Sequence, residues 1–350
     1  MAVPGWFLAV VVMAIALRFV IEARAFLLPL ATAVLLFTLL AAVIDRIAGL
    51  RVAGFPVPRW LAHIAGIAVI LLGLTAVAAI LSGQADALNA AIPRYVELLQ
   101  QLFAAGVAHL DVDIAAQLER ALTQIDITRT ATGLVGSAGS MLTGIGLVVL
   151  YVAFMLGERG VAKGKLKRIF PDSDHALDVG GLILDIATSV RRYVWIKTVV
   201  SVMTGTLAYA VLKPLGVDFA ETWALLIFLF NYIPNIGSIL GTILPAIVAL
   251  VQFDTITPFL VVVIVVGALQ FLIGNVVEPL MMGRSLRLSS FAIILSLIFW
   301  GAVWGVMGMF LSVPIMVVVM IVCAQVPAWR WVSILLSSDG SLPGEAPEAV

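Results

Sequence analysis

Two asparagines, two prolines and several small residues interrupt the apolar segment "NYIPNIGSILGTILPAIVAL", which runs from Asn231 to Leu250. Amide and hydroxyl groups bind polar ligands through neutral hydrogen bonds, and proline and glycine break the helix around them. In a bilayer, the backbone groups released by such a break need partners from protein, water, ion or solute. We therefore predict a substrate-binding site here, formed by Asn231, Pro234, Asn235, Gly237, Ser238 and Thr242. The alternative is a proline-kinked span whose asparagines hydrogen-bond to neighbouring helices.

A second polar stretch, "QFLIGNVVEPLMMGRSLRLSS", begins at Gln270. Its residues Asn275 and Glu278 are one helical turn apart, and a carboxylate at membrane depth usually marks an ion or substrate path, since it costs on the order of 3 kcal/mol. Glu278 and Arg284 are therefore candidates for coupling or gating, although both would also fit an ion pair at the cytoplasmic interface. Gln270 and Asn275 join the predicted substrate-binding residues, and Gln270 lies deeper in the apolar run but cannot carry protons.

The composition of the chain indicates an integral membrane protein. Hydrophobic residues make up 63% of the 350 residues and charged residues 11%, with a mean hydropathy of +1.17. Soluble domains carry about 25% charged residues. The 20 basic and 20 acidic residues cancel, so nothing favours nucleic acid as a partner. The single cysteine, Cys323, excludes an internal disulfide and a thiolate metal cluster.

The sequence gives no support to an enzyme or a cofactor-binding protein. The three histidines, His63, His109 and His175, are scattered between different loops or loop ends, so they offer neither a metal-binding pair nor a base beside a nucleophile. A GxxxxGK[ST] loop is missing from the sequence, which argues against direct use of ATP. We expect no cofactor and no metal site.

Runs of residues without charge predict the membrane spans. They lie at Gly5–Ile21, Ala25–Ile44, Leu61–Leu81, Gly133–Leu156, Lys197–Leu212 and Ile256–Ile273. Lysine and arginine are retained on the cytoplasmic side. The stretch from Gly157 to Lys197, with eight basic residues, is therefore predicted inside, and the stretch from Gly83 to Thr132, with six acidic and three basic residues, outside.

Two further apolar segments are too long for one straight span. Thr222–Val251 has 30 residues and Phe291–Gln325 has 35. Continuous helices of these lengths would measure about 45 and 52 Å, against a hydrocarbon core of ~30 Å. Re-entrant hairpins, which return to the side they entered from, would place Arg284 and Arg287 inside and Asp254 outside, as the positive-inside rule prefers. The region would then be an inverted repeat of span plus hairpin, as in many secondary transporters.

The predicted fold is an all-α polytopic membrane protein in six segments. They are N-terminal transmembrane helices at 1–82, an extracytoplasmic insertion of amphipathic helices at 83–132, a transmembrane helix at 133–156, a basic cytoplasmic loop with an amphipathic helix at 157–196, a transport region with both hairpins at 197–326, and a tail at 327–350. The glycines of "FWGAVWGVMGMFLSVP" in the second hairpin, which include Gly301, Gly305 and Gly308, are interpreted as positions of close helix packing.

Three stretches resemble a known family of bacterial permeases. They are "NYIPNIGSILGTILPAIVALV", "GNVVEPLMMGRSLRLSS" and "LSLIFWGAVWGVMGMFLSVPIMVVV". In their order and spacing the chain resembles the autoinducer-2 exporter family, and within it the branch that exports this quorum-sensing signal. The resemblance implies a multi-pass permease of the bacterial inner membrane that moves a small polar molecule or an ion and forms homo-oligomers. The family positions that carry over are Asn231, Pro234, Asn235, Gly237, Gly274, Asn275, Glu278, Pro279, Gly283 and Arg284.

Two transport functions fit these residues. An exporter of autoinducer-2 or a similar small polar metabolite needs mainly amide, hydroxyl and backbone groups, which the hairpins supply. A cation (sodium)/proton antiporter needs a titrating carboxylate at membrane depth, for which Glu278 is the candidate. A membrane scaffold whose outer helices bind a partner is the third possibility. The abundance of neutral polar groups favours the exporter.

Overall fold

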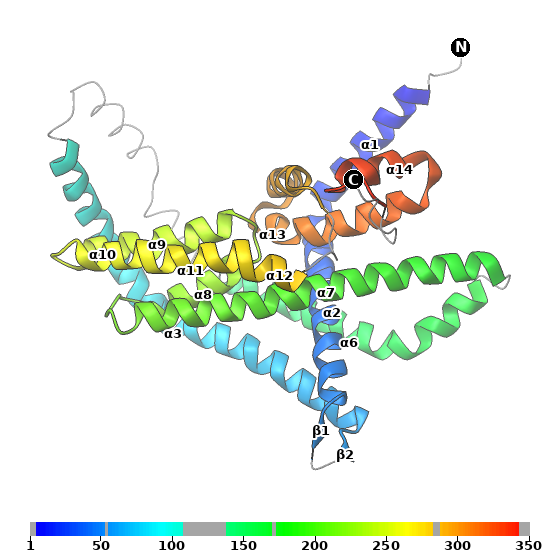
Figure 1. Ribbon diagram of the computed structural model, residues 1–350, viewed down its shortest axis with the longest axis horizontal. Coiled ribbons are helices and arrows are strands. Elements are labelled where there is room, and N and C mark those ends of the chain that lie inside the picture. The colour runs from blue at the N-terminus through cyan, green and yellow to red at the C-terminus, as the bar shows by residue number, and fades with distance from the viewer. Residues whose placement is uncertain (1–4, 53–54, 108–137, 170–172, 283–287, 343–350) are drawn as a thin grey trace. The chain divides into compact units, whose positions relative to one another are not determined.

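The computed structural model describes residues 5–52, 55–107, 138–169, 173–282 and 288–342 (Figure 1). Helices account for most of these residues, which confirms the expected all-α fold. The α-helices are α1 (Gly5–Glu22), α2 (Arg24–Ala48), α3 (Arg59–Val107), α6 (Ala138–Ile169), α7 (Ser173–Leu212), α8 (Ala220–Phe230), α9 (Ile236–Gln252), α10 (Thr257–Val261), α11 (Gly267–Leu272), α12 (Glu278–Met282), α13 (Ser290–Gln325) and α14 (Arg330–Leu336). The only strands in the described ranges are the antiparallel pair β1 (Arg51–Val52) and β2 (Phe55–Pro56).

Five helical stretches of the described residues are long and apolar enough to cross a membrane. They are Arg24–Ala48, Arg59–Gln84, Gly180–Leu212, Thr257–Met282 and Ser290–Gln325. The first four contain the predicted spans that begin at Ala25, Leu61, Lys197 and, but for one residue, Ile256. A multi-pass membrane protein is thereby confirmed. The predicted N-terminal span coincides with α1, and the described part of the predicted span at 133–156 lies in α6.

Helix α3 continues without a break from the predicted span into the predicted insertion. It extends to Val107 with Pro93 inside it, so the span and the first amphipathic helix of the insertion form one element. The rest of the predicted insertion, residues 108–132, lies outside the described residues. The long α7 (green in Figure 1) likewise passes through position 197, where the sequence analysis placed a segment boundary.

The first long apolar segment folds into two antiparallel helices. Helices α8 and α9 pack against each other and are separated by the turn residues 231–235. A Cβ atom built on Gly237 would lie 1.9 Å from the carbonyl oxygen of Phe230, and one built on Gly241 would lie 3.1 Å from the side chain of Ile227. Later residues of α9 therefore meet earlier residues of α8. The prediction of a break in this segment is confirmed, and we call α8, the turn and α9 the first helical hairpin.

The second long segment, α13, also turns back on itself. Gly305 adopts φ 65° and ψ −147°, a conformation outside the helical region that glycine reaches without a steric penalty. On either side of it, a Cβ on Gly308 would lie 1.9 Å from the carbonyl oxygen of Trp300, and the Ser296 hydroxyl donates to the carbonyl of Ser312 at 3.0 Å. Gly308 therefore serves close packing as expected, whereas Gly305 supplies the turn. We call the two halves of α13 the second helical hairpin.

The chain divides into two compact units, each with its own apolar core. Unit 1 comprises Met1–Ile67, Gly144–Thr198 and Pro279–Val350, and unit 2 comprises Ala68–Thr143 and Val199–Glu278. The core of unit 1 is built by α2, α7 and α13 from Leu35, Val190, Tyr193, Val194, Leu311, Val313, Val317, Met320 and Ile321. The core of unit 2 is built by α7, both arms of the first hairpin and the π-helical turn η1 (Val262–Val266) from Ala208, Leu212, Ile227, Ala246, Val248, Ala249, Val262 and Val266.

Part of the predicted tail is structured in unit 1. Beyond the short 3₁₀ turn η3 (Pro327–Trp329), α14 packs on α13. The backbone nitrogen of Ser289 donates to the carbonyl of Leu336 at 2.8 Å. The residue before the second hairpin is thereby joined to the segment that follows it.

Replacing Gly237 with alanine tests the close approach within the first hairpin. The added methyl group would collide with backbone atoms of Phe230 rather than with a flexible side chain. We expect Gly237→Ala to destabilise the protein by about 2–3 kcal/mol, measured as a lower thermal midpoint in detergent. Gly274→Ala is the matched control, because nothing lies within 4 Å of its added Cβ. Equal midpoints for the two variants would contradict the hairpin geometry.

Candidate solute-binding site at the first hairpin

The turn of the first hairpin holds one buried amide. The side-chain nitrogen of Asn231 donates a hydrogen bond of 3.0 Å to the hydroxyl of Ser201, a fully buried residue of α7 in the same unit. Asn231 thus fixes the turn to α7, as the kinked-span alternative also requires. Ser201 was not predicted as a site residue. Its signal in the sequence is the pair Ser201 and Thr204, which lie one turn apart in an otherwise apolar run.

Asn235 occupies a strained backbone position at the same turn. Its φ of 61° and ψ of −52° belong to a three-residue γ-turn, closed by a 2.7 Å bond from the nitrogen of Ile236 to the carbonyl of Pro234. Such conformations cost on the order of 1–3 kcal/mol and cluster at ligand sites. The Asn235 side chain is exposed, so the turn presents an amide outward.

The two predicted hydroxyl residues of α9 bond to their own helix. Ser238 donates to the carbonyl of Asn235 at 2.9 Å, and Thr242 donates to the carbonyl of Ser238 at 3.0 Å. Their protons are therefore engaged, and their oxygen lone pairs are the groups that they offer to a ligand. Together with Asn231, Pro234, Asn235 and Gly237, these residues form one continuous feature, the turn and the first two turns of α9.

The side chains of the two residues predicted on the following span, Gln270 and Asn275, point in different directions. Gln270 of α11 is 5% exposed, and a Cβ on Gly241 of α9 would lie 2.7 Å from its side-chain nitrogen. Asn275 is exposed and donates to the carbonyl of Phe271 at 2.9 Å, within its own helix. Gln270 therefore joins the first hairpin, whereas Asn275 does not. Glu278 begins α12 and is half-buried. Gly283 and Arg284 lie outside the described residues.

Both π-helical turns of this span flank Gln270. η1 (Val262–Val266) precedes α11 and η2 (Ile273–Val277) follows it, so Asn275 lies inside the second. A π-turn widens the helix by one residue, shifts the direction of the side chains beyond it, and is frequent at functional sites. Gln270 and Asn275 are five residues apart, so the ordinary helical period of about 3.6 residues per turn already directs them to different faces.

Lys197 is a buried cation that the sequence analysis did not select. It lies in the middle of the candidate span Gly180–Leu212, four residues before Ser201 in α7, and is 4% exposed. Lys197 was predicted at the cytoplasmic end of a span, because lysine commonly marks that position. Burying an ionisable side chain in a membrane helix costs free energy, so such a residue is a candidate for a functional role.

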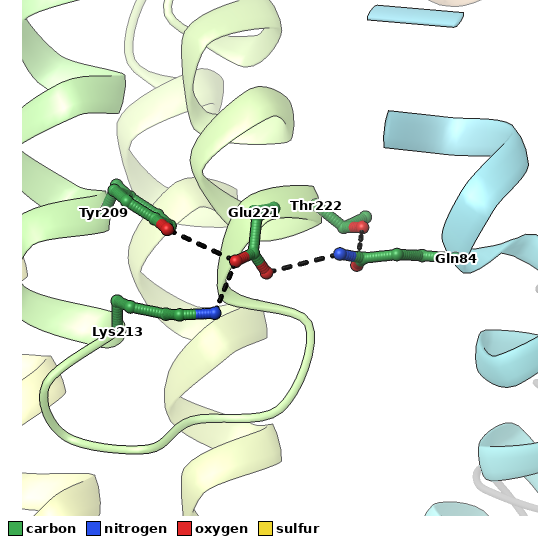
Figure 2. A network of polar contacts seen from close by, with 5 residues as sticks. All are labelled: Gln84, Tyr209, Lys213, Glu221 and Thr222. Carbon is green, nitrogen blue, oxygen red and sulfur yellow. Dashed lines mark hydrogen bonds and ion pairs between the residues drawn. The ribbon is translucent and has the colours of Figure 1, made fainter. Parts of the chain in front are cut away.

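A polar network surrounds Glu221 at the start of α8 (Figure 2). Its carboxylate accepts hydrogen bonds from Lys213 at 2.6 Å, Tyr209 at 3.2 Å and Gln84 of α3 at 3.2 Å. Thr222 in turn donates to the side-chain oxygen of Gln84. The network lies wholly in unit 2 and ties α3 and α7 to the base of the first hairpin. The network was not predicted from the sequence, because the predicted hairpin began at Thr222, one residue after Glu221.

The network keeps both members of its ion pair charged. The hydrogen bond from Lys213 is the main cause that lowers the pKa of Glu221 to about 2, and Glu221 raises the pKa of Lys213. Glu221 lies in the first turn of α8, outside the five candidate spans. A carboxylate with so low a pKa stays ionised near neutral pH, which favours a structural role for the network. Among the described residues, no group of three histidine, cysteine or acidic side chains is placed to hold a metal ion.

Comparison with known proteins places this chain among membrane transporters. Residues 7–328 match the family described as AI-2E family transporter. The chain is 33% identical over 287 residues to the AI-2 transport protein TqsA of Escherichia coli, covering 80% of this chain and 82% of that protein. It is 32% identical over 254 residues to the putative transport protein YhhT of the same organism, covering 71% of each chain. A putative transport protein of Borreliella burgdorferi is 35% identical over 214 residues, covering 61% of this chain and 58% of that protein.

The Glu221 network predicts a pH-dependent contribution to stability. Because the folded-state pKa of Glu221 is depressed, its contribution is full above the ordinary carboxyl pKa of 4.5 and is lost as the pH falls through about 2. We expect Glu221→Gln to lower the thermal midpoint by a few degrees between pH 5 and 8, with the difference from wild type shrinking below pH 4.5.

The matched control for this prediction is Glu158→Gln. Glu158 pairs with Lys165 at 3.1 Å, and both side chains are more than half exposed, so its loss should leave the midpoint unchanged. A midpoint that is equally insensitive to Glu221→Gln would remove the network as an anchor of the hairpin.

Proposed function

The chain belongs to the AI-2E transporter family, and from this premise we propose that it exports a small polar metabolite, with autoinducer-2 as the first candidate. It is a transporter rather than an enzyme, a multi-pass protein of the bacterial inner membrane that acts on a small solute. The identity of the solute is the proposed part. It is supported by the name of the Escherichia coli relative, the AI-2 transport protein TqsA.

The observation that carries the proposal is the turn of the first hairpin. Between Asn231 and Thr242 the chain has no acidic or basic residue, while it carries two amides, three hydroxyl groups and a strained backbone turn. Sites for neutral polar solutes use such groups because they orient a ligand without requiring a counter-charge. Asn231, Pro234, Asn235, Gly237, Ser238, Thr242 and Gln270 form the proposed site; Asn275 is left out because its side chain lies away from the hairpin.

The re-entrant arrangement is part of the same proposal. Helix α8 has 11 residues and α9 has 17, so at ~1.5 Å per residue neither spans a core of ~30 Å. The Gln252 side chain at the end of α9 donates to the carbonyl of Gly216 at 2.7 Å and accepts from the backbone nitrogen of Asp218 at 2.7 Å. The hairpin therefore ends beside the loop from which it starts, which supports entry and exit on one side.

The second hairpin supports the proposed inverted repeat. The backbone of Ser289, directly before it, bonds to Leu336 in α14, the helix that follows it. Each hairpin follows an apolar helix, Gly180–Leu212 for the first and Thr257–Met282 for the second. Two such units of opposite orientation are our proposal for the transport region. Assembly into homo-oligomers is also proposed, on the family resemblance.

A cation/proton antiporter is the second candidate function. The observation that favours it is the half-buried Glu278, which directly follows the π-helical turn η2. A carboxylate at such an irregular turn suits a site for ions, because π-turns recur where helices bind ligands. Glu278 is therefore proposed for coupling or gating, together with Arg284.

Efflux from liposomes that contain the purified protein and autoinducer-2 tests the exporter. Asn235→Ala removes the exposed amide but retains the strained φ, whereas Asn235→Gly removes the amide and relieves the strain. If the amide binds the solute, both variants raise the KM about tenfold, as expected for one lost hydrogen bond. Restored transport in Asn235→Gly alone would assign the position to backbone strain. A sodium-dependent change of internal pH that Glu278→Gln abolishes, without efflux of autoinducer-2, would select the antiporter.

Cysteine labelling from each side of the membrane tests the re-entrant arrangement. In a Cys323→Ser background, we expect Pro214→Cys and Asp254→Cys to react with an impermeant maleimide from the same side, and Ser341→Cys from the opposite side. Pro214→Cys and Asp254→Cys would react from opposite sides if the first hairpin crossed the bilayer.

A further inference from the structure

The side chain of Gln270 leaves one hydrogen-bonding group without a partner. Its amide nitrogen is buried and has no hydrogen-bond acceptor among the described residues. Buried amide groups in native proteins are nearly always paired, because an unpaired donor loses its hydration without compensation. Such a group inside a transporter is a candidate donor to a bound molecule.

The surroundings of Gln270 direct this nitrogen into the first hairpin. The nearest neighbour to a Cβ on Gly241 would be the Gln270 nitrogen at 2.7 Å, followed by the Ile227 side chain at 3.1 Å. Gly241 belongs to α9 and Ile227 to α8, so the amide faces both arms of the hairpin within unit 2. Because Gly241 has no side chain, the Gln270 amide can pack against its backbone without a clash.

The backbone groups of the hairpin arms are already engaged in helices, and the nearest hydroxyl group of α9, Thr242, donates to Ser238. The arms therefore offer Gln270 mainly apolar surface. Its helix, α11, lies between the π-turns η1 and η2, an arrangement that recurs where a helix carries a functional side chain.

We propose that the amide nitrogen of Gln270 donates a hydrogen bond to an oxygen atom of the transported solute, and that this contact selects neutral hydroxyl- or carbonyl-bearing solutes over metal cations. The inference rests on the proposed function and deepens it by naming the solute class. An N–H donor presents the positive end of its dipole, so it attracts an oxygen lone pair and repels a cation.

The test measures efflux of autoinducer-2 from liposomes containing wild type, Gln270→Leu or Gln101→Leu. Leucine has a volume close to that of glutamine and no donor, and Gln101 is an exposed glutamine of α3 that serves as the matched control. We expect Gln270→Leu to raise the KM about tenfold with a maximal rate within about twofold of wild type. Its thermal midpoint in solute-free detergent should equal or exceed that of wild type, because a buried unpaired donor has been removed. Gln101→Leu should change neither quantity.

An unchanged KM in Gln270→Leu would overturn the inference. A reduced maximal rate with a lowered thermal midpoint and an unchanged KM would overturn it too, by assigning Gln270 to packing.

If wild type does not move autoinducer-2, that solute is excluded, and thermal shifts with dihydroxyacetone, ribose, glycerol and sodium chloride decide the inference separately. Stabilisation of wild type by a neutral solute that Gln270→Leu loses would sustain it. Stabilisation by sodium that the variant loses, or no shift with any neutral solute, would overturn it.

Discussion

Every backbone N–H and C=O group inside a bilayer must find a partner in protein, water, ion or solute, because lipid offers none, and this constraint governs how a chain can turn there. The first hairpin meets it almost completely. Within the turn, the nitrogens of Asn231, Tyr232 and Ile233 donate to carbonyls of the last turn of α8 at 2.8 to 3.3 Å. Proline at position 234 has no N–H to satisfy. The apolar residues of both arms can then pack closely. The few polar side chains at the turn are not needed as partners for these backbone N–H groups.

The same constraint explains why the base of the hairpin carries charged side chains and its turn carries only neutral polar ones. Its base carries the ion pair of Glu221 and Lys213 at 2.6 Å, and the side chain of Gln252 bonds to the loop. Its turn carries amides and hydroxyls alone. A charged turn would need a counter-ion at depth, whereas a charged base sits where pairing and solvent both stabilise it. The hairpin is thus anchored at its base by an ion pair and hydrogen bonds, whereas its turn carries no charge.

The sequence predicts the class of the fold well because composition and the lengths of apolar runs are properties of single segments. The break around Pro234 is predictable for the same reason. Side-chain direction is harder to predict, because the helical period separates Gln270 from Asn275 but does not say which of the two faces the hairpin. The Glu221 network joins residues 137 positions apart, which no local pattern reports. Gly305 shows a third limit, since a glycine used for a turn and one used for packing look alike in a sequence.

The π-turns also bear on how the protein fits its lipid. The 26 residues from Thr257 to Met282 would make an α-helix of about 39 Å, well beyond a hydrocarbon thickness of ~30 Å. A span with such excess length tilts, bends or thickens the surrounding bilayer, and the sites where its backbone already departs from α geometry are where bending costs least. Gln270 lies between two of them. We therefore expect the acyl-chain length of the lipid to change the depth and direction of the Gln270 amide. Bilayers of graded thickness would adjust the position of this amide without any change of sequence.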